Sequence, residues 1–157
     1  MSGEVERRLA SHGILLPTPN TPAANYVPLT RSGNVIFVSG QVPLDDAGQR
    51  IVGRLGVDVS LEQGQQHARR CAASIIGHLR NALDGDLDRV TRILKLGVFV
   101  NATAEFTQHP LVANGASELF VLAFGEAGRH ARSAVGVQSL PGGVPVEVDA
   151  IVEVSQG

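Results

Sequence analysis

The sequence predicts an α+β fold in which a mixed β-sheet carries two helices packed on one face. Three observations lead to this prediction: one long amphipathic helical pattern, a strictly alternating strand near the C-terminus, and the order of the elements, β-β-α-β-α-β-β. One further short strand has room before the first long helix. Two helices lying on one face of a sheet are the economical way for such a chain to cover its core.

The first 24 residues are predicted to form a short helix and an extended arm, followed by a single domain over residues 25–157. Residues 4–10 have the length of about two helical turns. Prolines at positions 17, 19 and 22 then prevent helix and favour an extended path. We expect two strands, Tyr26–Leu29 and Val35–Val38, at the start of the domain, separated by a tight turn.

The clearest predicted helix spans Glu62–Leu83. Its apolar residues recur at steps of three and four and form one stripe, made of Ala68, Cys71, Ala72, Ile75, Ile76, Leu79 and Leu83. A second helix is expected over about Leu111–Gly125, with Leu119, Phe120 and Ala123 buried.

The later strands are predicted over Arg92–Asn101, Ser133–Gln138 and Val146–Val154. The first of these is almost continuously apolar, which is typical of a strand covered on both faces, although a buried helix has the same pattern. The last alternates, with Val146, Val148, Ala150, Val152 and Val154 on one side and Glu147, Asp149, Ile151 and Glu153 on the other.

If the turn at residues 140–143 makes a simple hairpin, the last two strands pair with each other. Arg132 then lies opposite Val152, and Glu147 lies about five rows away, or ~16 Å along the strands. The two side chains would serve one pocket only if that pocket formed between subunits. A polar sheet face with no helix left to cover it also favours a closed symmetric oligomer.

Composition excludes several classes of function. The chain has 157 residues, a formal charge of −2, 43% hydrophobic and 18% charged residues, which is typical of one soluble globular domain. No apolar run approaches the roughly 20 residues of a membrane span, and no secretory signal is visible, so we expect a cytoplasmic protein. A slightly acidic chain with one Tyr and no Trp is poorly equipped to bind nucleic acid.

Conventional metal and nucleophile chemistry finds little support. His67 and His78 would lie about 16 Å apart along one helix, which is too far for one metal ion. Cys71 falls on the buried stripe, where a core thiol is expected rather than a nucleophile. We therefore expect no metal and no cofactor.

Two polar residues occupy unusual positions in the strands. Arg132 shares a strand face with the small residues Ala134 and Gly136, which leaves room for a guanidinium fork that binds a ligand carboxylate. Glu147 begins the polar side of the last strand. The plainer interpretations, an exposed edge arginine and a solvated sheet face, stay open at this point.

The sequence resembles the Rid/YjgF superfamily, the reactive-intermediate deaminases often labelled endoribonuclease L-PSP. The most specific similarity is ARSAVGVQSLPGGVPVEVDAI (Ala131–Ile151), and the block SGQVP (Ser39–Pro43) comes next. Asn25-Tyr26, Gly33-Asn34, Val98–Val100, and Asn114 with Glu118 and Phe120 also match. The sequences of the N-terminal arm and of the segment VANGASELF are more similar to a distinct subfamily than to the best-studied deaminases.

This resemblance implies a chorismate mutase-like fold (bacillar type), assembled as a homotrimer with ligand sites in clefts between subunits. It implies hydrolysis of 2-imino or enamino acids to 2-oxo acids and ammonia, as by a 2-iminobutanoate/2-iminopropanoate deaminase. Arg132 matches the carboxylate-binding arginine and Glu147 the glutamate that orients water. Tyr26, Gly40 and Asn114 match substrate-binding positions, and Ala134 stands where a cysteine is common, its backbone making the contact.

Two other classes of function stay open at this point. The same cleft in a non-catalytic module would bind a small carboxylate such as a 2-oxo acid and report it to a partner. The family label suggests RNA cleavage, against which the net charge and the sparse aromatic residues argue. The expected partners are thus a second and third copy of the chain and a small imino acid, with no nucleic acid and no membrane.

Overall fold

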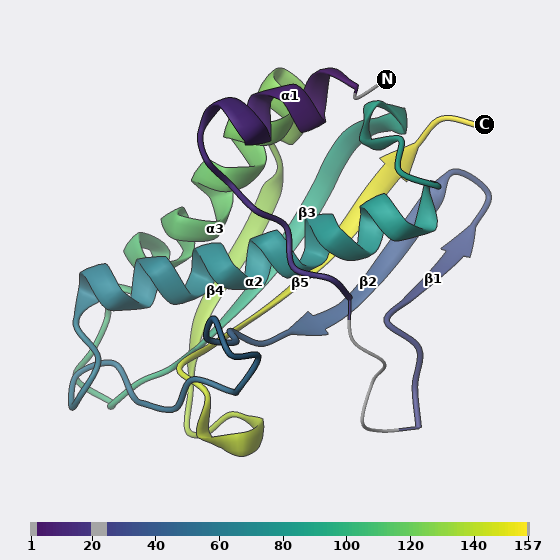
Figure 1. Cartoon of the computed structure of the whole chain (residues 1–157). Coiled ribbons are helices and arrows are strands. Elements are labelled where there is room, and N and C mark those ends of the chain that lie inside the picture. The colour runs from purple at the N-terminus through teal and green to yellow at the C-terminus, as the bar shows by residue number, and fades with distance from the viewer. Residues whose placement is uncertain (1–2, 20–24, 157) are drawn as a thin grey trace.

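A computed structural model describes residues 3–19 and 25–156 of the chain. A five-stranded sheet lies beneath a layer of helices, and both termini lie near the same end of the sheet (Figure 1). The predicted extended course at Pro22 lies outside the described residues. The elements in chain order are α1 (Glu4–Ser11), β1 (Leu29–Ser32), β2 (Val35–Gln41), α2 (Leu61–Ala82), η1 (Leu87–Arg89), β3 (Val90–Asn101), α3 (His109–Phe124), η2 (Gly125–Gly128), β4 (Ala131–Val137), η3 (Pro141–Gly143) and β5 (Val146–Val154).

The sheet has the strand order β1-β2-β5-β3-β4. The β3–β4 pair is parallel and the other pairs are antiparallel, so the predicted α+β fold with a mixed sheet is confirmed. The first strand begins at Leu29 rather than ending there. The further short strand that had room before α2 is reduced to isolated bridges such as Leu44 with Arg50.

The predicted hairpin between the last two strands is wrong. β4 and β5 do not pair with each other in the described sheet, because both pair with β3 and lie on opposite sides of it. Residues 138–145 form a connection with a short 3₁₀ turn, long enough for the chain to pass the end of β3 before it enters the sheet again. The spacing of Arg132 and Glu147 predicted from that hairpin is replaced by the geometry given below.

Helices α2 and α3 cover one face of the sheet, as predicted (Figure 1). α2 begins with a capping box, in which Ser60 and Gln63 exchange side-chain to backbone hydrogen bonds. All seven residues of its predicted apolar stripe are buried. The two helices approach so closely that a Cβ on Gly115 would collide with the backbone of Gln65, which requires glycine at that point.

The N-terminal segment lies on the outer side of the helices. α1 buries Val5 and Leu9, and its first two backbone N–H groups, on Glu4 and Val5, donate to the carboxylate of Asp88. Farther along, the chain passes over α2 at Pro17. The carbonyl oxygen of Pro17 would lie only 2.7 Å from a Cβ on Gly77. The described part of this segment is therefore fixed to the helices at both of its ends.

The face of the sheet turned away from the helices, here called the open face, carries Glu147, Asp149, Ile151 and Glu153 on β5. The burial of β5 alternates residue by residue, which confirms the predicted division into an apolar and a polar side. Phe37 and Val135 are about half exposed, at 49% and 46%, and their strand positions place them on this face with Ile151 and Glu147. No helix in the described part of the chain is long and apolar enough to cross a membrane.

Candidate functional site

Arg132 lies on β4, at the edge of the sheet, with its side chain directed toward α3. Its Nη1 donates to Oδ1 of Asn114 at 2.9 Å and to Oγ of Ser117 at 3.1 Å. Its Nη2 donates to the carbonyl oxygen of Pro110 at 3.2 Å. Three acceptors from one helix therefore hold the guanidinium, so its place is set by the packing of β4 against α3.

This arrangement leaves part of the guanidinium free. An arginine has five N–H donors. Nη1 uses both of its hydrogens and Nη2 uses one, so Nε–H and the second hydrogen of Nη2 have no acceptor among the described residues. A planar guanidinium binds a carboxylate through two such hydrogens. Since Arg132 is only partly buried, a ligand can reach them.

A hydrogen-bonded chain continues from Arg132 through Ser117 to His130. Nδ1 of His130 lies 2.6 Å from the carbonyl oxygen of Gly128 and must carry the proton to make that bond. Nε2 then accepts from the hydroxyl of Ser117 at 2.8 Å. Because its proton is directed at His130, the oxygen of Ser117 presents its lone pairs to Arg132. Burial is the main cause that lowers the pKa of His130; the hydrogen bond to Gly128 opposes this shift, and the charge of Arg132 adds to it, so the neutral form is favoured.

Glu147 occupies a second position, on the open face of the sheet. A Cβ built on Gly40 would lie 2.9 Å from Cδ of Glu147, so glycine at position 40 makes room for the carboxyl group. Gly40 is part of an irregularity in the β2–β5 register, between Val38 and Gln41. Burial is the main cause that raises the pKa of Glu147, and the neighbouring charge of Asp149 raises it further.

Asp149 follows Glu147 on the same face. Its Oδ1 accepts a hydrogen bond from the backbone N–H of Gly97 at 3.0 Å. Burial raises the pKa of Asp149, while the Gly97 hydrogen bond and the charge of Lys95 oppose the rise. Two half-buried carboxyl groups therefore stand side by side, and a group in such a pair takes up a proton more readily than an isolated carboxylate.

Arg132 and Glu147 lie on opposite faces of the sheet. Arg132 pairs with Leu96, whose partner on β5 is Ala150, and this row faces the helices. Glu147 pairs with Phe99, three residues farther along β3, and an odd offset reverses the face. The two Cα atoms are separated by about 10 Å along the strands and about 10 Å across two strand intervals. They do not share a pocket within one subunit.

The structure thus brings the predicted site residues into two groups. Asn114 contacts Arg132, with Ala134 two residues farther along the same strand face, and Gly40 contacts Glu147. Tyr26 joins neither group. It precedes β1 at the other edge of the sheet, about 19 Å across the strands from β4, and is 53% exposed.

Sequence reasoning missed Ser117 and the carbonyl oxygen of Pro110. Ser117 follows Asn114 by three residues, which places both on one face of a helix, so this spacing was a usable signal. A backbone acceptor such as Pro110 leaves no trace in the sequence. The described residues contain no cluster of three or more His, Cys, Asp or Glu side chains able to bind a metal ion. Cys71 is fully buried, and burial raises the pKa of its thiol.

Comparison with known proteins places the fold. Residues 6–145 match the family described as "YjgF/chorismate mutase-like, putative endoribonuclease". Because the match covers most of the chain, the chain belongs to this family, which is the Rid/YjgF superfamily that the sequence resembled. The chorismate mutase-like fold expected from that resemblance agrees with the mixed sheet and its helix layer.

Individual relatives cover most of the chain and differ mainly in their sequence identity to it. Protein TCP17 of Trypanosoma cruzi is 50% identical over 98% of this chain and 96% of its own length. The structure of Atu1372 from Agrobacterium tumefaciens, a protein of unknown function, is 45% identical with a TM-score of 0.89, covering 96% of this chain and 92% of that one. RidA from Psychrobacter is 25% identical with a TM-score of 0.58, covering 87% and 94%.

Proposed function

We propose that this protein hydrolyses reactive 2-imino and enamino acids, such as 2-iminobutanoate and 2-iminopropanoate, to 2-oxo acids and ammonia. The observation that carries the proposal is the state of Arg132. Three acceptors of α3 fix its guanidinium, while two of its hydrogens are left for a carboxylate. Such a preorganised cation fits a small substrate whose constant feature is a carboxylate beside the reacting carbon.

Arg132 would fix the substrate carboxylate by a two-pronged contact. Because the C=N carbon is bonded directly to that carboxylate, holding one places the other. The protonated imine is already a strong electrophile, so orientation supplies much of what the reaction needs, on the order of several kcal/mol. The hydrogen bonds from Arg132 to Asn114 and Ser117 keep the cation from following the substrate into solvent.

Glu147 would activate the water. Its carboxylate takes a proton from water as the oxygen bonds to the C=N carbon, which gives a neutral carbinolamine. The protonated Glu147 then returns this proton to the nitrogen, the C–N bond breaks, and ammonia leaves as the hydroxyl becomes the 2-oxo group. The released proton ends on ammonia as ammonium. General-base assistance of this kind is typically worth about 10²–10⁴-fold.

The cleft would form between the subunits of a homotrimer. The separation of Arg132 and Glu147 on opposite faces supports this assembly, because one subunit offers each group without the other. The half-exposed Phe37 and Val135 on the open face also support a partner there. In a single subunit their apolar side chains are exposed to water, and a neighbouring subunit would bury them. Tyr26 of an adjoining subunit would close the cleft over the substrate.

Membership of a family that includes RidA supports this chemistry. The family description also mentions an endoribonuclease, but a net charge of −2 and one Tyr without Trp do not favour an RNA-binding surface. A non-catalytic carboxylate-binding role would use the same guanidinium of Arg132 and differs only in the absence of turnover.

The experiment couples the purified protein to an amino-acid oxidase that releases 2-imino acids, with semicarbazide present to trap the imine. We expect the protein to reduce semicarbazone formation, and Arg132→Ala to abolish this effect. Wild-type protein that behaves like the variant would refute the hydrolase proposal. A 2-oxo acid that protects such an inactive protein against heat, in an Arg132-dependent way, would instead identify a binding module. RNA cleavage that survives repurification and is lost in Glu147→Ala would identify a nuclease.

A further inference from the structure

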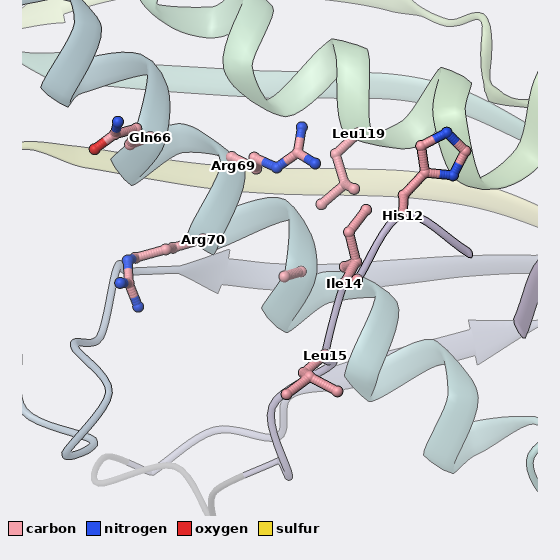
Figure 2. Close-up of a pocket in the computed structure, with 9 residues that line it drawn as sticks. His12, Ile14, Leu15, Gln66, Arg69, Arg70 and Leu119 are labelled. Atoms are coloured by element: carbon pink, nitrogen blue, oxygen red, sulfur yellow. The ribbon is translucent and has the colours of Figure 1, made fainter. Parts of the chain in front are cut away.

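An open surface cavity lies on the helix side of the molecule, where the segment after α1 passes over α2 and α3 (Figure 2). Its volume is about 370 Å³, within the range of clefts that bind small molecules. None of the residues that surround Arg132 or Glu147 lines it. The lining residues are His12, Gly13, Ile14, Leu15, Gln66, Arg69, Arg70, Ala73 and Leu119.

Arg69 is the feature that distinguishes this cavity. Its side chain reaches from α2 toward Leu119 of α3 and is partly buried (Figure 2). Its guanidinium makes no hydrogen bond or ion pair with any described residue. Its nitrogen atoms are not among the buried polar atoms that lack a partner, so they stay accessible and an incoming anion can replace the water that hydrates them.

Arg70, the next residue, provides the contrast. Its side chain points away from Arg69, toward the loop after β2 (Figure 2). Its Nη1 donates to the carbonyl oxygen of Leu44 at 3.0 Å and to Oδ1 of Asp46 at 3.1 Å. The two neighbouring arginines line one cavity, yet among the described residues only Arg70 has an acidic partner.

The remaining lining indicates the chemistry of a ligand. No aspartate or glutamate is among the nine lining residues, although the chain as a whole is acidic. Nδ1 of His12 contacts the carbonyl oxygen of Arg8 at 2.9 Å, so Nε2 of His12 is available to a ligand. Ile14 and Ala73, both partly exposed, supply apolar surface beside the cation, and the fully buried Leu119 packs behind them.

We propose that this cavity binds a monocarboxylate with an apolar tail. The carboxylate would engage Arg69 through two N–H groups, and the tail would lie along Ile14 and Ala73. The site is separate from the proposed hydrolytic cleft and does not depend on it, because it lies on the outer side of the helices. The N-terminal segment, held at Asp88 and at Gly77, supplies one wall of it.

The test is a calorimetric titration of the full-length protein with octanoate, with octan-1-ol as the uncharged control. We expect octanoate to bind more tightly than octan-1-ol, and Arg69→Gln to weaken octanoate by about 10-fold or more. Arg70→Gln should bind like wild type, because that guanidinium is already engaged. The same comparison is made in an Arg132→Gln background, where the proposed cleft has lost its carboxylate anchor: octanoate should still bind, and Arg69→Gln should still weaken it, which separates this site from the cleft.

Three results would overturn the proposal: no octanoate binding by wild-type protein up to about 10 mM, equal binding by Arg69→Gln, or octan-1-ol binding as tightly as octanoate. A thermal melt of each variant shows whether Arg69→Gln folds normally. A second variant, Ala73→Leu, fills the cavity while leaving the charge of Arg69 in place. It should also weaken octanoate, and unchanged binding would count against the site.

Discussion

Gly40 and Glu147 are in such close contact that a methyl group on Gly40 would press against the carboxyl carbon of Glu147 at 2.9 Å. The two residues lie on neighbouring strands, β2 and β5, where the register between the strands is irregular. The absence of a side chain at position 40 thus decides where the carboxyl group of Glu147 can lie. Gly40, which has no reactive side chain, thereby controls the position of the Glu147 carboxyl group.

Gly40→Ala should therefore lower turnover while leaving the fold intact, because the side chain of Glu147 can rotate away from the new methyl group. Loss of a general base costs about 10²–10⁴-fold, and misplacement should cost part of that. The measurement is kcat for imine hydrolysis in Gly40→Ala, Glu147→Ala and the double variant. If Gly40 acts through Glu147, the double variant is no slower than Glu147→Ala; additive losses would contradict this.

Arg132→Lys should be nearly as damaging as Arg132→Ala. An ammonium group cannot satisfy Asn114, Ser117 and Pro110 while also presenting two parallel donors to a carboxylate. We expect kcat/KM to fall by about 10- to 100-fold or more, the worth of charged hydrogen bonds. Activity of the lysine variant within about twofold of wild type would mean that a point charge suffices and that the fork plays no part.

The chain from His130 through Ser117 to Arg132 should act on substrate binding. His130→Gln keeps an acceptor near the position of Nε2, whereas His130→Asn keeps a donor near Nδ1 and loses the contact with Ser117. We expect KM to rise in Ser117→Ala and His130→Asn, and less in His130→Gln, with melting temperatures compared as the control. Equal KM values for the two His130 variants would indicate that the imidazole only fills space beside Phe120.

The acid limb of the pH profile should report Glu147. Its pKa is raised, so protonation at mildly acidic pH removes the base, and kcat/KM should fall as pH falls through that raised value. Asp149→Asn keeps an oxygen for the Gly97 N–H but removes the neighbouring charge. The acid limb should then move to lower pH. A limb that stays in place would assign it to another group.

The parts of the fold that depend on burial of one face were readable from the sequence. The stripe along α2 and the alternation of β5 follow from packing one side of each element against the core, and the structure has both. The strand order was not readable, because residues 138–145 are compatible both with a hairpin and with a passage around β3. The local sequence of a strand does not determine which other strand it pairs with.

The candidate site was readable only in part. Arg132 and Glu147 were singled out by their positions in the strands as well as by the family resemblance, whereas Asn114 and Gly40 came from the resemblance alone; their contacts in two pairs follow from the fold. The carbonyl oxygen of Pro110 and the tautomer of His130 depend on three-dimensional packing. The half-buried state of Glu147 and Asp149 likewise comes from β5 being a central strand, which the predicted hairpin did not require.

The most direct measurement is subunit complementation. Arg132→Ala and Glu147→Ala proteins, each inactive alone, are co-expressed in equal amounts and assayed for imine hydrolysis. If each cleft takes its arginine from one subunit and its glutamate from the next, random trimers should recover about one quarter of wild-type activity. Wild-type protein mixed equally with the double variant should likewise retain about one quarter, rather than one half. A complemented mixture as inactive as its two parents would contradict a cleft shared between subunits.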